Sequence, residues 1–172
     1  GFIEETGAAQ YYRDARILTI YEGTTAIQAN DLVGRKTARD GGQTAKAIAA
    51  QIAKTEAELT QSGSAAALAV AKHLAAGRAA FLNVVDFVVA NIKSKPNAVF
   101  AGSVPYVMLA GNLIAGWQLA RSLLVAEAQL KTGKKDTDLF DAEFMQAKII
   151  TAQFYAEHIL SKAPNIGQSI VA

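Results

Sequence analysis

The chain has 172 residues, and its 17 Lys and Arg against 15 Asp and Glu give a formal net charge of only +2. This length fits one compact domain or one domain with an appendage, because domains run to about 100–200 residues. With 51% hydrophobic and 19% charged residues, the sequence is too apolar for intrinsic disorder. The weak charge argues against a nucleic-acid partner, and the lack of cysteine excludes disulfides, cysteine-bound zinc and a thiol nucleophile. A cysteine-free chain fits a reducing compartment, so we expect a cytoplasmic protein.

The first residues, Gly1 to Glu5, contain neither an initiator methionine nor the basic start and apolar core of a signal peptide. We therefore expect that the chain begins inside a longer protein or a processed one.

The longest uncharged stretch lies between Lys95 and Arg121 and is nominally long enough to span a bilayer. Polar residues and prolines interrupt it at Pro96, Asn97, Ser103, Pro105, Asn112 and Gln118. We interpret the stretch as a buried helix of a bundle, with no membrane span. A membrane-active helical protein is the alternative reading.

Helix is expected almost everywhere, because the sequence is rich in alanine and has only three prolines. Short helices are predicted over residues 4–15 and 24–39, with an extended stretch over 17–21 between them, because that run is β-branched and aromatic. Long helices are then predicted over residues 43–60, 64–94, 99–131 and 137–162. These elements predict an all-α fold, an up-and-down bundle of about four long helices preceded by a short helical or loop segment.

Several residues mark the expected helix boundaries. Thr25 and Gln28 have the spacing of a capping box, and Ser64 is placed to cap the helix that follows it. Pro105 is expected in the first turns of its helix or at a kink, and Pro164 is expected to end the last helix. The predicted core residues are Ile48, Ile52, Leu59, Leu82, Val85, Val89, Ile92, Met108, Leu109, Leu113, Trp117, Leu123, Leu124, Phe140, Phe144, Ala147, Ile150 and Phe154.

Few residues outside the first forty suggest chemistry. His73 and His158 have no second ligand at helical spacing, so no metal site is expected, and no phosphate-binding glycine loop is present. Glu22, in contrast, ends an apolar run and precedes a glycine and a helix start. Partial burial would raise its pKa and suit it to act as a general base, whereas the helix start favours its charged form. The residues alone leave both roles open.

The segments Arg13–Ile17, Ile20–Thr25 and Ile27–Gln28 closely resemble the carboxyl-terminal signature of the acyl-CoA dehydrogenases. The continuation through Asp31–Lys36 resembles the branch of that family with an extra carboxyl-terminal helical domain. The resemblance implies a division into residues 1–42, the end of the catalytic carboxyl-terminal domain, and residues 43–172, an accessory helical bundle.

The resemblance also implies an activity. In the family, a glutamate at the position of Glu22 removes the α-proton of an acyl-CoA thioester, FAD accepts the β-hydrogen as hydride, and electron-transfer flavoprotein reoxidises the flavin. Tyr21 and Gly23 match the residues that line the thioester. The stretch that touches FAD is matched by Thr24, Thr25 and Ala26. Ala26 stands where the family often has a longer polar residue, so a contact there would use the backbone.

Most flavin contacts of the family lie in domains that precede this region. We therefore expect the 172-residue chain alone to be colourless and inactive, and the parent protein to be a homo-oligomer. The alternative hypothesis is that residues 43–172 form a non-catalytic interaction or oligomerisation module.

Overall fold

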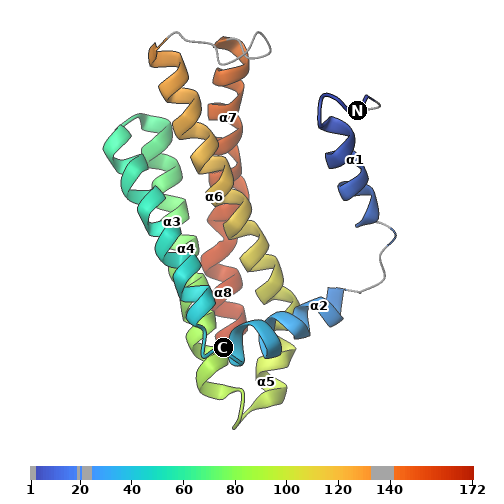
Figure 1. Cartoon of the computed structure of the whole chain (residues 1–172). Coiled ribbons are helices and arrows are strands. Elements are labelled where there is room, and N and C mark those ends of the chain that lie inside the picture. Colours follow the sequence, from blue (N-terminus) through green and yellow to red (C-terminus); the bar gives the residue numbers. More distant parts are fainter. Residues whose placement is uncertain (1–2, 19, 21–24, 133–141) are drawn as a thin grey trace.

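The computed structural model describes residues 3–18, 20, 25–132 and 142–172. Helices make up most of this part of the chain, and it contains no strand, so the predicted all-α fold is confirmed. In chain order the elements are α1 (Ala8–Ile17), α2 (Thr25–Asp31), the π-helical η1 (Leu32–Ala38), α3 (Gln43–Ser62), α4 (Ala65–Asn91), α5 (Pro96–Ala101), α6 (Ser103–Thr132), α7 (Ala142–His158), the 3-10 helix η2 (Leu160–Lys162) and α8 (Ala163–Val171) (Figure 1).

Four long helices, α3, α4, α6 and α7, run alternately up and down and build the bundle (Figure 1). The central helix is α4, which packs against α3, α6, α7 and α8. At the foot of the bundle α2 crosses α6, and η1 packs against α3, α4 and α6. The segment that carries the recognised signature is therefore joined directly to the bundle.

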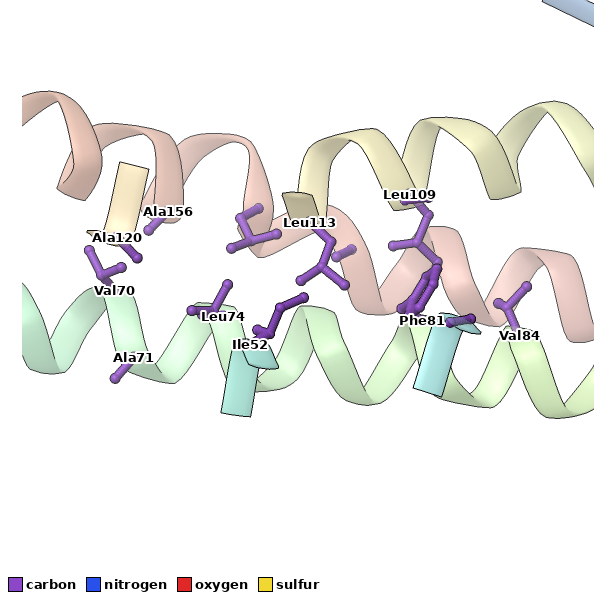
Figure 2. Close-up of a cluster of buried hydrophobic side chains, with 14 of the residues drawn as sticks. Ile52, Val70, Ala71, Leu74, Phe81, Val84, Leu109, Leu113, Ala120 and Ala156 are labelled. Carbon is purple, nitrogen blue, oxygen red and sulfur yellow. The ribbon is translucent and has the colours of Figure 1, made fainter. Parts of the chain in front are cut away.

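The core is formed where α3, α4 and α6 face one another. Figure 2 shows Ile52 of α3, Leu74 and Phe81 of α4, and Leu109 and Leu113 of α6 pointing into a shared interior. Ile52, Leu74 and Leu109 are completely buried. Burial of a side chain of this size contributes about 1.5–3 kcal/mol, so this cluster is a main source of bundle stability.

Two glycines let Leu160 enter between α4 and α6. A Cβ atom at Gly116 would lie 2.8 Å from Leu160 Cδ2, and one at Gly77 would lie 3.0 Å from Leu160 Cδ1. Leu160 itself is completely buried. The absence of side chains at Gly77 and Gly116 thus creates the space that the leucine fills.

Two polar contacts fix α3 to its neighbours. Arg78 donates to Glu56 through Nε at 2.7 Å and through Nη2 at 2.8 Å, and both side chains are mostly buried. These hydrogen bonds, followed by the charge of Glu56, raise the pKa of Arg78 against the opposing effect of burial. On α6, Trp117 Nε1 donates to Thr55 Oγ1 at 2.9 Å. Both contacts restrict how α3 can slide along the bundle.

Several predicted boundaries are confirmed. Ser64 Oγ accepts from the backbone N–H of Ala67 at 3.0 Å and caps α4. Gly63, with φ +70°, ends α3 in the left-handed conformation that glycine tolerates. Pro105 lies in the first turn of α6, where its missing N–H needs no partner.

Other predicted boundaries are wrong. The helix predicted over 99–131 is two helices, α5 and α6, separated at Gly102, where a Cβ atom would lie 2.7 Å from Ile170 Cγ2. Pro164 does not end a helix but lies in the first turn of α8, a position that suits proline. The structure therefore continues the helical packing almost to the last residue.

The predicted extended stretch over 17–21 is wrong for its described residues. Ile17 is the last residue of α1, and Leu18 keeps a helical backbone with φ −61° and ψ −26°. The N–H of Ile20 donates to the Ile17 carbonyl at 3.0 Å, which closes a turn. Local hydrogen bonds replace the strand partner that an extended backbone would need. Thr19 and Tyr21 lie outside the described residues.

The predicted buried face of the last long helix is also wrong. Ala147, Ile150 and Phe154 are exposed, and α7 instead buries Ile149, Ala152 and Ala156. Small alanines let α7 pack closely on the bundle, which turns the larger apolar side chains outward. Phe144 and Met108 were also predicted to be buried but are exposed, and Phe140 lies outside the described residues.

The remaining core predictions are confirmed fully or in part. The buried ones are Ile52, Leu59, Val85, Leu109, Leu113 and Leu123. The half-buried ones are Ile48, Leu82, Val89, Ile92, Trp117 and Leu124.

Candidate functional site

The signature residues 13–28, which we call the signature segment, begin in α1 and end in α2. Glu22, the predicted base, lies outside the described residues, as do Tyr21, Gly23 and Thr24. Two further predicted site residues open α2. Thr25 is its first residue, although the structure does not describe the Thr25 side chain. Ala26 follows it and is exposed. Of the predicted cofactor-contacting residues, Thr25 and Ala26 thus lie at the start of a helix.

Apolar side chains of this segment face outward on both sides of Glu22 in the sequence. Leu18 is 77% exposed and Ile27 is 62% exposed, and Ile17 and Ile20 are exposed as well. Large aliphatic residues concentrated around one short segment are typical of a surface that another group covers. The described apolar residues that flank Glu22 in the sequence can therefore supply a contact to a substrate or to another part of a protein.

On the bundle side the segment is anchored by a buried polar pair. Thr37 Oγ1 and Tyr106 OH are 2.9 Å apart and joined by a hydrogen bond, and both residues are buried. Burial raises the pKa of Tyr106, although the hydrogen bond with Thr37 acts in the opposite direction. Ala29 and Val33, which precede Thr37 by eight and four residues, are also completely buried. The α2–η1 segment is therefore held by the bundle rather than merely linked to it.

The turn between η1 and α3 is organised by Asp40. Its Oδ1 accepts from the N–H of Gly42 and its Oδ2 accepts from the N–H of Thr44, both at 2.9 Å. Hydrogen bonds from Thr44, followed by those from Gly42 and Gln43, lower the pKa of Asp40. Gly42 has φ +78°, and a Cβ atom there would lie 2.7 Å from Val85 Cγ1, so only glycine fits this turn.

An apolar cavity of about 140 Å³ lies where η1, α3, α4 and α6 meet. Its walls include Leu32, Ile48 and Ile52, with Thr37 and Tyr106 on the polar side. A wider groove of about 510 Å³ lies between α6 and α7, and Arg121 and Lys148 are among the residues that line it. Neither space borders Ala26 or the described apolar residues of the signature segment.

Sequence reasoning missed the Thr37–Tyr106 pair and the turn cap at Asp40. The signal for Asp40 was present, because an aspartate before two glycines and a helix is typical of a helix-start cap. Nothing in the sequence pairs Thr37 with Tyr106, since the two residues are 69 positions apart in the chain.

Within the described residues, no three His, Asp or Glu side chains gather as a metal site requires. The same residues include one helix, α4, that is long and apolar enough to cross a membrane by length and composition alone. It is also the central helix of the bundle, so its composition is only weak evidence for a membrane span.

Comparisons with family models identify the family of the chain. A family model described as "Acetyl-CoA dehydrogenase C-terminal like" matches residues 44–172, and one described as "Acyl-CoA dehydrogenase, C-terminal domain" matches residues 1–37. The chain belongs to the acyl-CoA dehydrogenase C-terminal family. The resemblance found in the first forty residues is thereby confirmed and extends over the bundle.

Named relatives agree with this family. A 3-methylmercaptopropionyl-CoA dehydrogenase from Ruegeria pomeroyi is 58% identical over 160 residues, which covers 93% of this chain and 26% of the relative. The broad-specificity linear acyl-CoA dehydrogenase FadE5 from Mycobacterium tuberculosis is 34% identical, with 93% and 26% covered. A butyryl-CoA dehydrogenase from Syntrophomonas wolfei is 32% identical, with 93% and 25% covered. The chain spans about a quarter of the length of these relatives.

Proposed function

We propose that the chain is the carboxyl-terminal part of a flavin-dependent acyl-CoA dehydrogenase. Residues 1–42 complete its catalytic domain, and residues 43–172 form an accessory helical domain. The observation that carries this proposal is the agreement between the signature around Glu22 and the names of three relatives, all of them acyl-CoA dehydrogenases.

In the proposed reaction the Glu22 carboxylate takes the α-proton of an acyl-CoA thioester. The β-hydrogen leaves with its electron pair, so a trans double bond forms between the α and β carbons. Tyr21 and Gly23 line the thioester. The side chains of Ile20 and Ile27, which flank Glu22 in the sequence, are exposed and are proposed to supply apolar surface to the base, since exclusion of water raises the basicity of a carboxylate.

FAD, when bound, accepts the β-hydrogen as hydride. The described residues fit a flavin contact, because Thr25 and Ala26 begin α2 and its first turn has no acidic side chain. Backbone N–H groups at a helix start are free to donate to acceptor atoms of a ligand. Thr24, Thr25 and Ala26 are therefore proposed to hold part of the cofactor through their backbone.

The relatives' names share the acyl-CoA thioester and differ in the acyl group, so the proposed substrate is an acyl-CoA without a specified acyl chain. The proposed electron acceptor is electron-transfer flavoprotein. The whole protein is proposed to be a cytoplasmic homo-oligomer. Within it, the bundle supports the signature segment through the buried residues Val33 and Thr37.

The non-catalytic alternative, an interaction or oligomerisation module, concerns the bundle alone and is compatible with this proposal. Deletion of residues 43–172 from the full-length protein distinguishes a supporting role from a catalytic one. Most flavin contacts of the proposed protein lie outside residues 1–172, so we expect the flavin to stay bound and assembly or substrate scope to change, although α2 and η1 lose the buried contacts of Val33 and Thr37.

The test of the base replaces Glu22 in the full-length protein. We expect Glu22→Gln to lower acyl-CoA oxidation by on the order of 1,000-fold, while flavin absorbance and assembly stay unchanged. Asp14→Asn is the matched control, because Asp14 is an exposed carboxylate in the same segment. Turnover within about two-fold of normal in Glu22→Gln would contradict the proposal.

The 172-residue chain alone is proposed to hold no flavin and to be inactive. A flavin absorption band that stays with this chain through gel filtration, or dye reduction on addition of acyl-CoA, would contradict that part of the proposal.

A further inference from the structure

The outward side of α6 carries no charge over its first five turns. Five of its exposed positions, Val104, Met108, Gly111, Ala115 and Gln118, recur in alternating steps of four and three residues, and we call them the α6 outer stripe; Ile114 is exposed beside them. Helices that face water normally carry charged residues on that side. The other bundle helices do so, with exposed Lys46, Lys54 and Glu58 on α3 and Lys72 and Asp86 on α4.

Gly111, at the middle of the α6 outer stripe, has no packing reason among the described residues. A Cβ atom there would have nothing within 4 Å in the described part of the chain. At Gly77 and Gly116, in contrast, a Cβ atom would press against Leu160. Glycine inside a helix costs about 1 kcal/mol relative to alanine, so a glycine without a close neighbour calls for an explanation. Beside Ala115 it leaves room for the backbone of another helix to approach α6.

The spacing of the α6 outer stripe is that of a helix-packing seam. Steps of four and three residues keep one side of a helix against a second helix along its whole length. The stripe extends over about 20 Å, since a helix rises by about 1.5 Å per residue. Its occupant is therefore expected to be a single helix lying along α6.

We propose that the α6 outer stripe is the docking site for a helix of the remaining catalytic domain in the same polypeptide, an inference that rests on the proposed function. The stripe is about 20 Å long and one helix, about 10 Å, wide, so its footprint is on the order of 200 Å². Two separate proteins need about 800 Å² on each side for a stable contact. A tethered domain needs far less, because the linkage supplies a high effective concentration.

The position of the signature segment supports this occupant. Residues 1–37 match the carboxyl-terminal domain of acyl-CoA dehydrogenases, and α2, within that segment, packs on the foot of α6 (Figure 1). The relatives are about four times as long as this chain. A catalytic domain that includes α2 therefore already contacts α6, whereas a second copy of the chain would have only the small footprint to hold it.

The experiment measures the accessibility of the α6 outer stripe with a single thiol. The chain has no cysteine, so Met108→Cys introduces the only thiol of the 172-residue chain. Its maleimide labelling is measured by peptide mass spectrometry in this chain and in the full-length protein. Ala76→Cys, at an exposed position on α4, is the matched control. We expect position 108 to label at least ten-fold more slowly in the full-length protein, and position 76 to label equally in both.

Three results would overturn the proposal. Equal labelling of position 108 in both proteins means that the catalytic domain does not cover it. Protection that appears in the 172-residue chain itself and grows with its concentration means that a second copy is the occupant. Protection of that chain only after addition of anionic phospholipid vesicles means that a membrane is the occupant.

A second variant checks the close approach at Gly111. Gly111→Leu is expected to leave the melting temperature of the 172-residue chain unchanged or higher and to lower that of the full-length protein. An unchanged melting temperature in both proteins would contradict a close contact. Neither the labelling nor the melting temperature depends on turnover. If Glu22→Gln loses activity but position 108 is not protected, the docking site is rejected and the proposed function stands.

Discussion

Leu160 packs between two glycines. This packing predicts that Gly116→Ala lowers the free energy of unfolding of the native chain but raises that of the Leu160→Ala chain. Gly116→Ala adds a Cβ atom 2.8 Å from Leu160 Cδ2, far closer than ordinary van der Waals contact. The leucine cannot simply rotate away, because its other methyl group already lies against Gly77 on α4. In the Leu160→Ala background that obstacle is gone.

The expected magnitudes follow from two opposing effects. Overpacking of a well-filled core costs about 1–3 kcal/mol, and replacement of glycine by alanine inside a helix contributes about 1 kcal/mol of stability. We therefore expect Gly116→Ala to destabilise the native chain by about 1 kcal/mol and to stabilise Leu160→Ala by about 1 kcal/mol. The coupling energy between the two sites is then about 2 kcal/mol.

Urea unfolding followed by circular dichroism measures all four free energies of unfolding in this cycle. Gly111→Ala is the control, because a Cβ atom there meets none of the described residues, and it should stabilise both backgrounds equally. If Gly116→Ala has the same sign in both backgrounds, Leu160 does not occupy the space between α4 and α6.

Two further predictions concern polar contacts. Glu56→Gln should lower the free energy of unfolding by about 3 kcal/mol, because Arg78 then lies mostly buried beside a neutral partner; a loss below about 0.5 kcal/mol would show that the ion pair is not needed. Asp40→Asn should remove an acid-sensitive contribution: since hydrogen bonds lower the pKa of Asp40, its stabilising effect is complete above the ordinary aspartate pKa of about 3.9 and is lost as the pH falls through the lowered value. Melting temperatures of the native chain and Asp40→Asn should therefore converge in acid, and parallel curves down to about pH 2 would contradict this role.

The fold could be predicted because helix propensities and the residues that begin or end helices agree along most of the chain. Ser64, Pro105 and the glycine turn at residues 41–42 act locally, so the sequence is enough to read them. The register of α7 could not be predicted, because the apolar stripe of Ile150 and Phe154 is a typical buried face. Packing decides the register instead, since Ala152 and Ala156 on the other side of α7 are small enough for close contact with the bundle.

The candidate site could be predicted only through family resemblance. A glutamate before a helix start fits a general base and a helix-dipole partner equally well, and no local rule separates the two. The extended conformation predicted around Ile17 failed for a related reason, because propensity scales describe a residue in a sheet and cannot show whether a partner strand exists. The support that the bundle gives to the site depends on the contact between Thr37 and Tyr106, which no local pattern encodes.

The burial of Val33 and Thr37 in the bundle limits where such proteins can be divided into separate domains. The two family matches meet between residues 37 and 44. The packing does not divide at that point, because Val33 and Thr37, which precede it, are buried in the bundle that follows it. A protein cut after Gly42 would expose an apolar surface, and the Thr37 hydroxyl would lose its hydrogen-bond partner Tyr106. Exchange of this carboxyl-terminal unit between dehydrogenases therefore requires that α2 and η1 travel with it.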